Sequence, residues 1–176
     1  MWREKLNASI PLEGGGVRLR QLNTRDAALY CSVCNNREVQ TFLGWTPISS
    51  KWKAVRQIKQ WGMPDSKWFF LVVETQTGAI PIGLGGFRYE DKGPENDTLL
   101  AILPDYQKVG NGEEALGLLK ALWLDGLGNP QCFASVESEN AGAIKLLLAK
   151  GFSLLREQDH PTNSNKVRQI YVATTA

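Results

Sequence analysis

One junction in the chain reads Leu103-Pro104-Asp105-Tyr106-Gln107-Lys108-Val109-Gly110-Asn111-Gly112-Glu113-Glu114-Ala115-Leu116. Before it, residues 98–103 are mostly apolar and predict a strand, which Pro104 ends. After it, apolar residues recur at the i, i+3, i+4 and i+7 spacing of an amphipathic helix over residues 112–124. The sequence therefore predicts a strand, a glycine-containing loop and a helix in succession.

A junction of this kind suits a phosphate group, because it directs several backbone N–H groups and the positive end of a helix dipole at one point. The helix dipole contributes only about 0.3–2 kcal/mol, so hydrogen bonds from the N–H groups must supply most of the binding. Gly110 and Gly112 allow positive φ angles and leave room for a ligand. Glu113 and Glu114 would repel a phosphate, so we expect their carboxylates to point away from the loop.

Two other interpretations fit the glycines taken alone. An ordinary turn into a helix stays open at this point. A dinucleotide-binding loop also fits, because residues 110–115 match G-x-G-x-x-A and Glu137 lies where such folds place an acidic residue. The dinucleotide interpretation fails, since residues 104–109 separate the strand from the glycines and too few residues follow to complete such a domain.

The rest of the chain shows strand and helix patterns in turn. We expect strands at 17–22, 68–74, 79–89, 98–103, 132–136, 154–155 and 167–172, and helices at 25–35, 50–61, 112–124 and 141–150. The continuous apolar run at 68–74 belongs near the sheet centre. Residues 158–165, including His160, read as an exposed polar loop. The fold is predicted to be α/β, with a mixed, mostly antiparallel central sheet of six to seven strands and helices on both faces.

The composition excludes several classes of protein. With 20 basic and 18 acidic residues the net charge is +2, and no run of like charges predicts nucleic-acid binding. The N-terminal residues lack the apolar core of a signal peptide, and no apolar run approaches the ~18 residues that cross a bilayer. We therefore expect one domain over residues 1–176, cytoplasmic, with no nucleic-acid or membrane partner, as a monomer or homodimer.

The three cysteines do not form a disulfide framework. Cys31 and Cys34 have the spacing of a redox motif, but both lie within the expected helix 25–35, and no His or second Cys pair is near. We expect these thiols and Cys132 to pack in the core, as reduced cysteines commonly do, and we expect no metal site.

A family resemblance gives the junction a more specific meaning. Gln107-x-x-Gly110-x-Gly112 matches the Q/R-x-x-G-x-G/A pattern of GNAT acetyltransferases. The stretches 105–107 and 114–116, together with Val136-Glu137-Ser138-Glu139-Asn140 and Lys150-Gly151-Phe152, resemble the branch that acetylates the N-termini of ribosomal proteins. The segments 19–22 and 43–45, with Asp26, fit that branch too. The resemblance covers about residues 17–172.

The resemblance implies that the chain is an enzyme using acetyl-coenzyme A as its acetyl donor. Backbone groups of Ile102 and Leu103 would pair with the pantetheine arm as an added strand would. Gln107 would shape the loop, and Asn140 would hydrogen-bond the cofactor while also serving as a helix N-cap. The pyrophosphate would be held by backbone N–H groups of Lys108, Val109, Gly110, Asn111 and Gly112.

The catalytic residues are less well defined. Many GNAT members carry a Tyr at the position of Leu147, and relatives often carry a Ser at that of Ala143. Asp97 is our candidate base, because relatives tend to carry a Glu nearby; the alternative is a solvated loop carboxylate. At pH 7 roughly a tenth of α-amino groups are in the neutral form, against fewer than about one in a thousand lysine amines. An α-amine therefore depends less on a general base than a lysine does.

The resemblance therefore predicts an N-acetyltransferase acting on a peptide or protein N-terminal α-amine. Two alternatives remain at this stage: a small-molecule amine as acceptor, and a non-catalytic module that binds acetyl-coenzyme A. We hypothesise that Trp45 and Trp52 line the acceptor groove.

Overall fold

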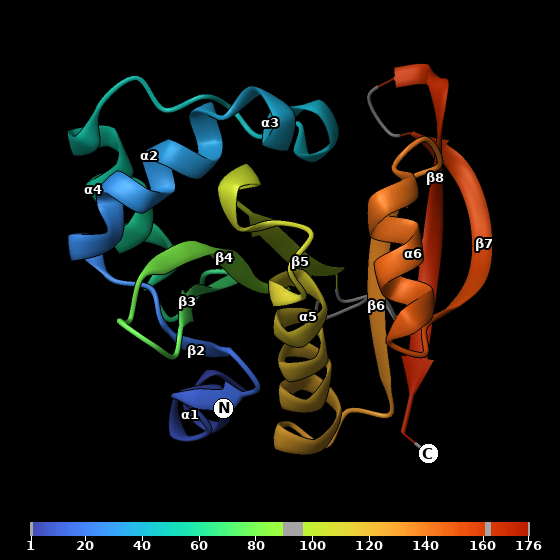
Figure 1. The fold of residues 1–176 in the computed structure, drawn as a ribbon, viewed down its shortest axis with the longest axis horizontal. Helices are drawn as coiled ribbons and strands as arrows, with labels where there is room; N and C mark the ends of the chain where they lie inside the picture. The colour runs from blue at the N-terminus through green and yellow to red at the C-terminus, as the bar shows by residue number, and fades with distance from the viewer. Residues whose placement is uncertain (1, 90–96, 161–162, 176) are drawn as a thin grey trace.

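The computed structural model describes residues 2–89, 97–160 and 163–175. Its centre is one eight-stranded sheet in the order β1-β2-β3-β4-β5-β6-β8-β7 (Figure 1). Adjacent strands of this sheet are antiparallel, except β5 and β6, which are parallel. The strands are β1 (Leu12–Gly14), β2 (Val17–Gln21), β3 (Trp68–Thr75), β4 (Pro81–Arg88), β5 (Asp97–Ile102), β6 (Gln131–Glu137), β7 (Ser153–His160) and β8 (Asn163–Thr174). The mixed, mostly antiparallel sheet is confirmed, with β1 as an additional strand.

Helices cover both faces of the sheet, as predicted. They are α1 (Trp2–Ala8), α2 (Ala27–Asn35), α3 (Arg37–Leu43), α4 (Lys51–Trp61), α5 (Asn111–Ala121) and α6 (Ala141–Ala149), with short helical turns η1 (Thr24–Asp26), η2 (Pro104–Tyr106) and η3 (Leu122–Gly126). In Figure 1, α5 lies in front of β5, α6 lies in front of β6 and β8, and β7 lies to the right of α6. The helices α2 and α4 pack against Val72, Leu84 and Ala101 on the other face. Across the described ranges, no helix combines the length and apolar composition that a membrane crossing requires.

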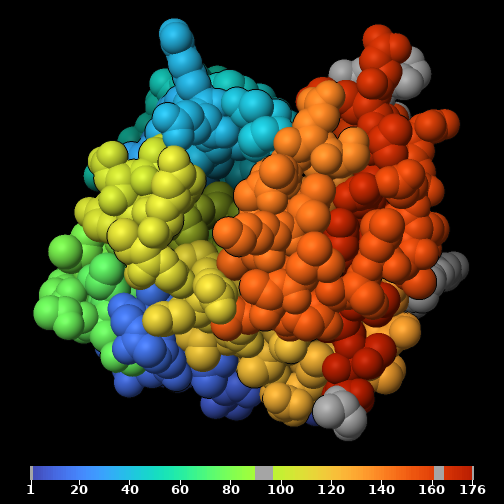
Figure 2. Space-filling view, turned by 45° about the vertical axis from the view of Figure 1, so that its right-hand side comes forward, coloured from blue at the N-terminus to red at the C-terminus, as the bar shows by residue number. Residues whose placement is uncertain are grey.

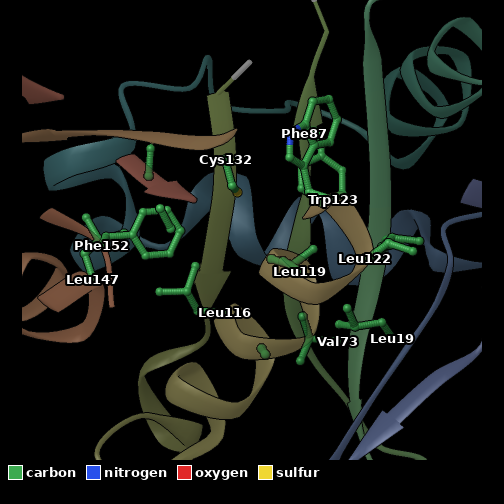
Figure 3. Close-up of a cluster of buried hydrophobic side chains, with 14 of the residues drawn as sticks. Leu19, Val73, Phe87, Leu116, Leu119, Leu122, Trp123, Cys132, Leu147 and Phe152 are labelled. Atoms are coloured by element: carbon green, nitrogen blue, oxygen red, sulfur yellow. The ribbon is translucent and has the colours of Figure 1, made fainter. Parts of the chain in front are cut away.

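The core under α5 explains why the predicted amphipathic helix docks where it does. Leu116 and Leu119 from α5, followed by Leu122 and Trp123 from η3, point into the sheet (Figure 3). Each buried leucine contributes about 1.5–3 kcal/mol. A Cβ built on Gly85 of β4 would lie 2.9 Å from the Leu119 side chain, so glycine permits the close approach of helix and sheet. This core fixes the start of α5, and hence the loop before it.

The predicted polar loop at 158–165 is wrong. β7 and β8 pair almost to their tip, with Asp159 opposite Val167 and His160 opposite Asn163. The side chains of β7 are exposed along almost its whole length. A strand whose side chains are largely exposed shows no hydrophobic alternation, which is why its sequence resembled a loop.

Three short elements were also missed: α1, β1 and α3. Each has seven residues or fewer and one buried side chain at most, so the periodic signal is too short to recognise. The turn η1, which leads into α2, begins after Asn23, whose side chain accepts a hydrogen bond from Arg25 N. Cys34 and Cys132 are buried as predicted, and Cys31 is partly buried.

Candidate cofactor site

The sheet opens between the parallel strands β5 and β6. Within the described ranges, Asp97 and Phe133 are the one pair of partner residues between these strands. Asp97 Oδ1 accepts a further hydrogen bond of 2.9 Å from Ser135 N. We call this the closed end of the gap and the Ile102 end the open end. Figure 2 shows a hollow in the surface between the yellow segment that follows β5 and the orange helix α6.

The two edges of β5 differ in their backbone hydrogen bonds. Leu103 N donates to Ile82 O at 2.9 Å, which places Leu99, Ala101 and Leu103 in hydrogen-bonded pairs with β4. By alternation, the backbone groups of Leu100 and Ile102 point toward β6, with which the described ladder has already ended. An extended ligand can therefore pair with this edge. The predicted pairing of Leu103 N–H with the pantetheine arm is corrected, because this N–H donates to Ile82 O of the β4 segment. Leu100 was not among the predicted site residues, although the two-residue repeat of a strand indicates it once Ile102 is chosen.

The loop after β5 is held from within by two side chains. Gln107 Nε2 donates to Ile102 O at 2.6 Å, and Asn111 Nδ2 donates to Tyr106 O at 2.9 Å. Both bonds fold the loop back onto the end of β5. Position 107 thus carries a side chain that donates to a strand carbonyl and leaves the backbone N–H groups of the loop uncommitted.

These N–H groups are the main feature of the site. Within the described residues, the amides from Lys108 to Gly112 have no protein acceptor, and no side chain caps α5. Lys108 and Gly110 have φ angles of 62° and 94°, and alternation of right- and left-handed residues gathers successive N–H groups into an anion-binding concavity. A Cβ on Gly110 would meet no atom within 4 Å, so the space above the loop is open.

The expectation for Gly112 is corrected by the structure. Gly112 lies in the first turn of α5, outside the positive-φ region, and Lys108 adopts the left-handed conformation instead. A Cβ at position 112 would lie 3.7 Å from Leu146 and 3.9 Å from Ile102, which are ordinary contacts. Glycine at position 112 thus provides space between α5, α6 and β5, and its freedom to adopt a positive φ is not used.

Both acidic residues of the first helical turn point away from the loop, as predicted. The Glu114 carboxylate accepts a hydrogen bond from Gly16 N at 2.5 Å, in the turn between β1 and β2. Glu113 forms an ion pair of 3.1 Å with Lys150. These contacts remove two negative charges from the place where an anion would bind.

Asn140 stands at the N-terminus of α6. Its side-chain oxygen accepts a hydrogen bond of 3.1 Å from Ala143 N, so the N-cap role is confirmed. With its oxygen committed to the helix, Asn140 offers a cofactor its amide N–H groups. Its part in cofactor binding stays a prediction.

Asp97 lies at the closed end, five residues before Ile102 and thus about 17 Å along the strand. Burial raises the pKa of its carboxyl, while hydrogen bonds from Ser135 and the charges of Arg168 and Arg88 act in the opposite direction. The carboxylate ties β5 to β6 through Ser135 N. The structure thus gives Asp97 a strand-joining role, and the predicted role as base stays untested.

The positions that usually carry polar catalytic groups are apolar here. Leu147 is buried beside Phe152 in the core (Figure 3), and Ala143 packs against the same cluster. Trp45 lies edge-on to Phe70 at 5.7 Å between ring centroids, and Trp52 is 68% exposed. Neither Trp45 nor Trp52 lines the cavity beside Trp2 or the cavity beside Asn7. The acceptor-groove hypothesis for them stays a prediction.

Comparison with known families agrees with this geometry. A family model described as an acetyltransferase (GNAT) domain matches residues 17–153. No curated protein sequence matches significantly.

Solved structures resemble the chain over nearly its whole length. A GNAT-family acetyltransferase from Bacillus anthracis has a TM-score of 0.79 at 11% identity, covering 93% of this chain and 97% of that chain. The ribosomal-protein-S5-alanine acetyltransferase from Vibrio fischeri has a TM-score of 0.72 at 16% identity, covering 93% and 95%. A chimera of the spermidine N-acetyltransferase SpeG from Vibrio cholerae and hSSAT has a TM-score of 0.77 at 16% identity, covering 91% and 96%. At these identities the likeness concerns the fold alone.

Proposed function

Because the chain belongs to the acetyltransferase (GNAT) family, we propose that it moves the acetyl group of acetyl-coenzyme A to the α-amine of a peptide or protein. The observation that carries the proposal is the row of uncommitted amides from Lys108 to Gly112 beside the open edge of β5. A ligand with a diphosphate at one end and an extended amide arm at the other satisfies both sets of groups.

The residues present fit acetyl-coenzyme A. Amides of the 108–112 loop would hold the pyrophosphate. The backbone N–H and C=O of Leu100 and the N–H of Ile102 would pair with the pantetheine arm, since Ile102 O already accepts from Gln107. Gln107 orients the loop through Ile102 O, and the Asn140 amide supplies a further donor. When bound, the cofactor supplies a thioester, the activated form of the acetyl group. The protein then contributes mainly by positioning the amine against it.

The β5 edge of the gap and the apolar α6 positions favour an acceptor that needs little help in losing a proton. Residues 98–103 of the chain carry no ionisable side chain, and Ala143 and Leu147 are apolar. An α-amine is already neutral in about a tenth of molecules near pH 7, whereas a lysine amine is neutral in fewer than one in a thousand. A weakly basic α-amine therefore suits this site better than a lysine.

Release of free thiol from acetyl-coenzyme A over a panel of peptides and polyamines tests the proposal. We expect turnover with peptides that have a free α-amine, and none with the same peptides blocked at the N-terminus. Turnover confined to small amines would retire the peptide acceptor, and binding of coenzyme A without any turnover would mark a non-catalytic module.

A further inference from the structure

A charged cluster lies on β6 and β8 outside the residues assigned to the cofactor. Glu137, the last residue of β6, forms an ion pair of 2.5 Å with Lys166 Nζ and lies 3.7 Å from His160 Nε2. Arg168 Nη2 lies 3.3 Å from the same His160 nitrogen. Since arginine only donates, His160 Nε2 accepts in this arrangement. The Glu137 side chain is only 11% exposed, whereas the Lys166 side chain is 31% exposed, so Glu137 is the buried member of a partly exposed cluster.

The register of the sheet places this cluster beside the gap. Asp97 is level with Phe133, and four residues farther along each strand bring Ala101 of β5 level with Glu137. Ala101 packs with the α2 and α4 cluster, whereas Ile102 packs on the α5 face. Glu137 pairs with Arg168, and its neighbour Val136 is in the α5-face core. Glu137 therefore faces the side of the sheet opposite to the cofactor helices.

On this geometry, and resting on the proposed function, we propose that Glu137, Lys166 and Arg168 recognise the acceptor. Glu137 accepts hydrogen bonds from the acceptor's amine, in the position that Lys166 Nζ now shares. Lys166 and Arg168 donate to oxygens close to that amine. An acceptor that comes from the face covered by α2 and α4 reaches the edge of β5 at Ala101 without crossing the cofactor loop.

The charges of this cluster indicate which class of acceptor it recognises. The cluster has mixed charge, because the Glu139 carboxylate also acts on Lys166 and the Asp97 carboxylate interacts with Arg168. A polyamine, which carries only positive groups, offers no acceptor to Lys166 and Arg168 and leaves these two donors unmatched. A peptide N-terminus offers an amine followed by a carbonyl oxygen two bonds away, and an acidic residue near it offers more acceptor oxygens. We infer selection for peptide α-amines, strongest when an Asp or Glu follows.

Steady-state kinetics of Glu137→Gln tests the assignment, with peptides starting Ser-Glu and Ser-Lys and with spermidine as acceptors. Loss of the carboxylate is expected to raise the peptide KM about tenfold, the effect of one charge-assisted contact. Affinity for coenzyme A is expected to stay within about twofold. Lys166→Met is expected to remove the preference for Ser-Glu over Ser-Lys and to improve spermidine use.

Glu157→Gln is the matched control, because Glu157 lies on β7, pairs with Gln169 and faces the opposite side of the hairpin. It should leave all three acceptors unchanged. A wild-type protein that acetylates peptides while Glu137→Gln keeps the peptide KM overturns this inference alone. A wild-type protein that fails to bind coenzyme A overturns the proposed function as well. Retained coenzyme A affinity in the variant excludes misfolding as the cause of a raised KM.

Discussion

The two edges of strand β5 are formed by the same residues, but they differ in how far their backbone groups pair with the neighbouring strand. Toward β4 the ladder is complete, with six residue pairs from Asp97–Arg88 to Ile102–Gly83. Toward β6 the described residues form one pair, at Asp97 and Phe133. The edge toward β4 stabilises the fold, and the edge toward β6 leaves backbone groups for a ligand.

The difference shows how a buried sheet can hold an unpaired edge. Exposed edges invite unwanted pairing, and here α5 and α6 flank the gap while Asp97 fixes its closed end. The cost of leaving backbone groups unpaired is offset when a ligand takes the missing partner's place. The following variants alter one edge, or the loop beyond it, and leave the other intact.

The largest effect is expected from Gly110→Val. At a φ of 94° a β-branched residue is strained, so the loop must change its backbone and redirect its amides. Loss of two charge-assisted hydrogen bonds would weaken coenzyme A binding by about 100-fold (~3 kcal/mol), measured by calorimetry.

Gly128→Val is the matched control for this loop. Gly128 has a φ of 70° and, like Gly110, open space at its Cβ, but it lies between η3 and β6. Both variants should lose similar stability, and only Gly110→Val should lose coenzyme A. Equal affinity in the two variants would contradict the account of the loop.

A smaller loss is expected from Gln107→Ala, which removes the 2.6 Å bond to Ile102 O. The loop amides stay in place but are less well oriented, so the dissociation constant for coenzyme A should rise about tenfold (~1.4 kcal/mol). The melting temperature should fall by only a few degrees. An unchanged dissociation constant would show that the loop keeps its shape without this contact.

Asp97 offers a comparison at the closed end. Asp97→Asn keeps an oxygen that can accept from Ser135 N, so turnover should stay within about threefold of wild type. Asp97→Ala leaves that N–H unsatisfied and should lose about 1–3 kcal/mol of stability. If Asp97→Asn instead abolishes turnover in folded protein, the role as base predicted from the sequence is favoured.

The pH dependence of stability gives a second measure at Asp97. Because burial raises the pKa of this carboxyl in the folded state, its stabilising contribution is fully present below its ordinary value of 3.8 and is lost as pH rises through the folded value. Wild type should therefore lose stability relative to Asp97→Asn as the pH rises above the ordinary value of 3.8, as followed by urea unfolding. A constant difference over that pH range would contradict burial of the charge.

The elements predicted best from the sequence are those with a clear pattern of apolar residues. The apolar run of β3 and the stripe of Leu118, Leu119 and Leu122 after the junction identify a buried strand and a docked helix, and both are found. The glycine pattern after β5 locates the loop. Gly110 takes the left-handed conformation there because only glycine does so without strain.

What the sequence does not encode is pairing between distant strands. Nothing in the residues of β5 indicates that its described ladder with β6 consists of the pair Asp97 and Phe133, because the partner strand lies far along the chain. The left-handed Lys108 is equally hidden, because a non-glycine residue carries no signal for positive φ. His160 was placed in a loop because its strand has polar side chains on both faces.

Amide-resolved hydrogen exchange, with and without saturating coenzyme A, tests the central claim most directly. Bound cofactor should slow exchange at Leu100, Ile102 and the amides from Lys108 to Gly112. It should leave Leu99 and Ala101, already bonded to β4, almost unchanged. Equal protection at Ala101 and Ile102, or none in the 108–112 loop, would contradict the assignment of the open edge of β5 to the cofactor.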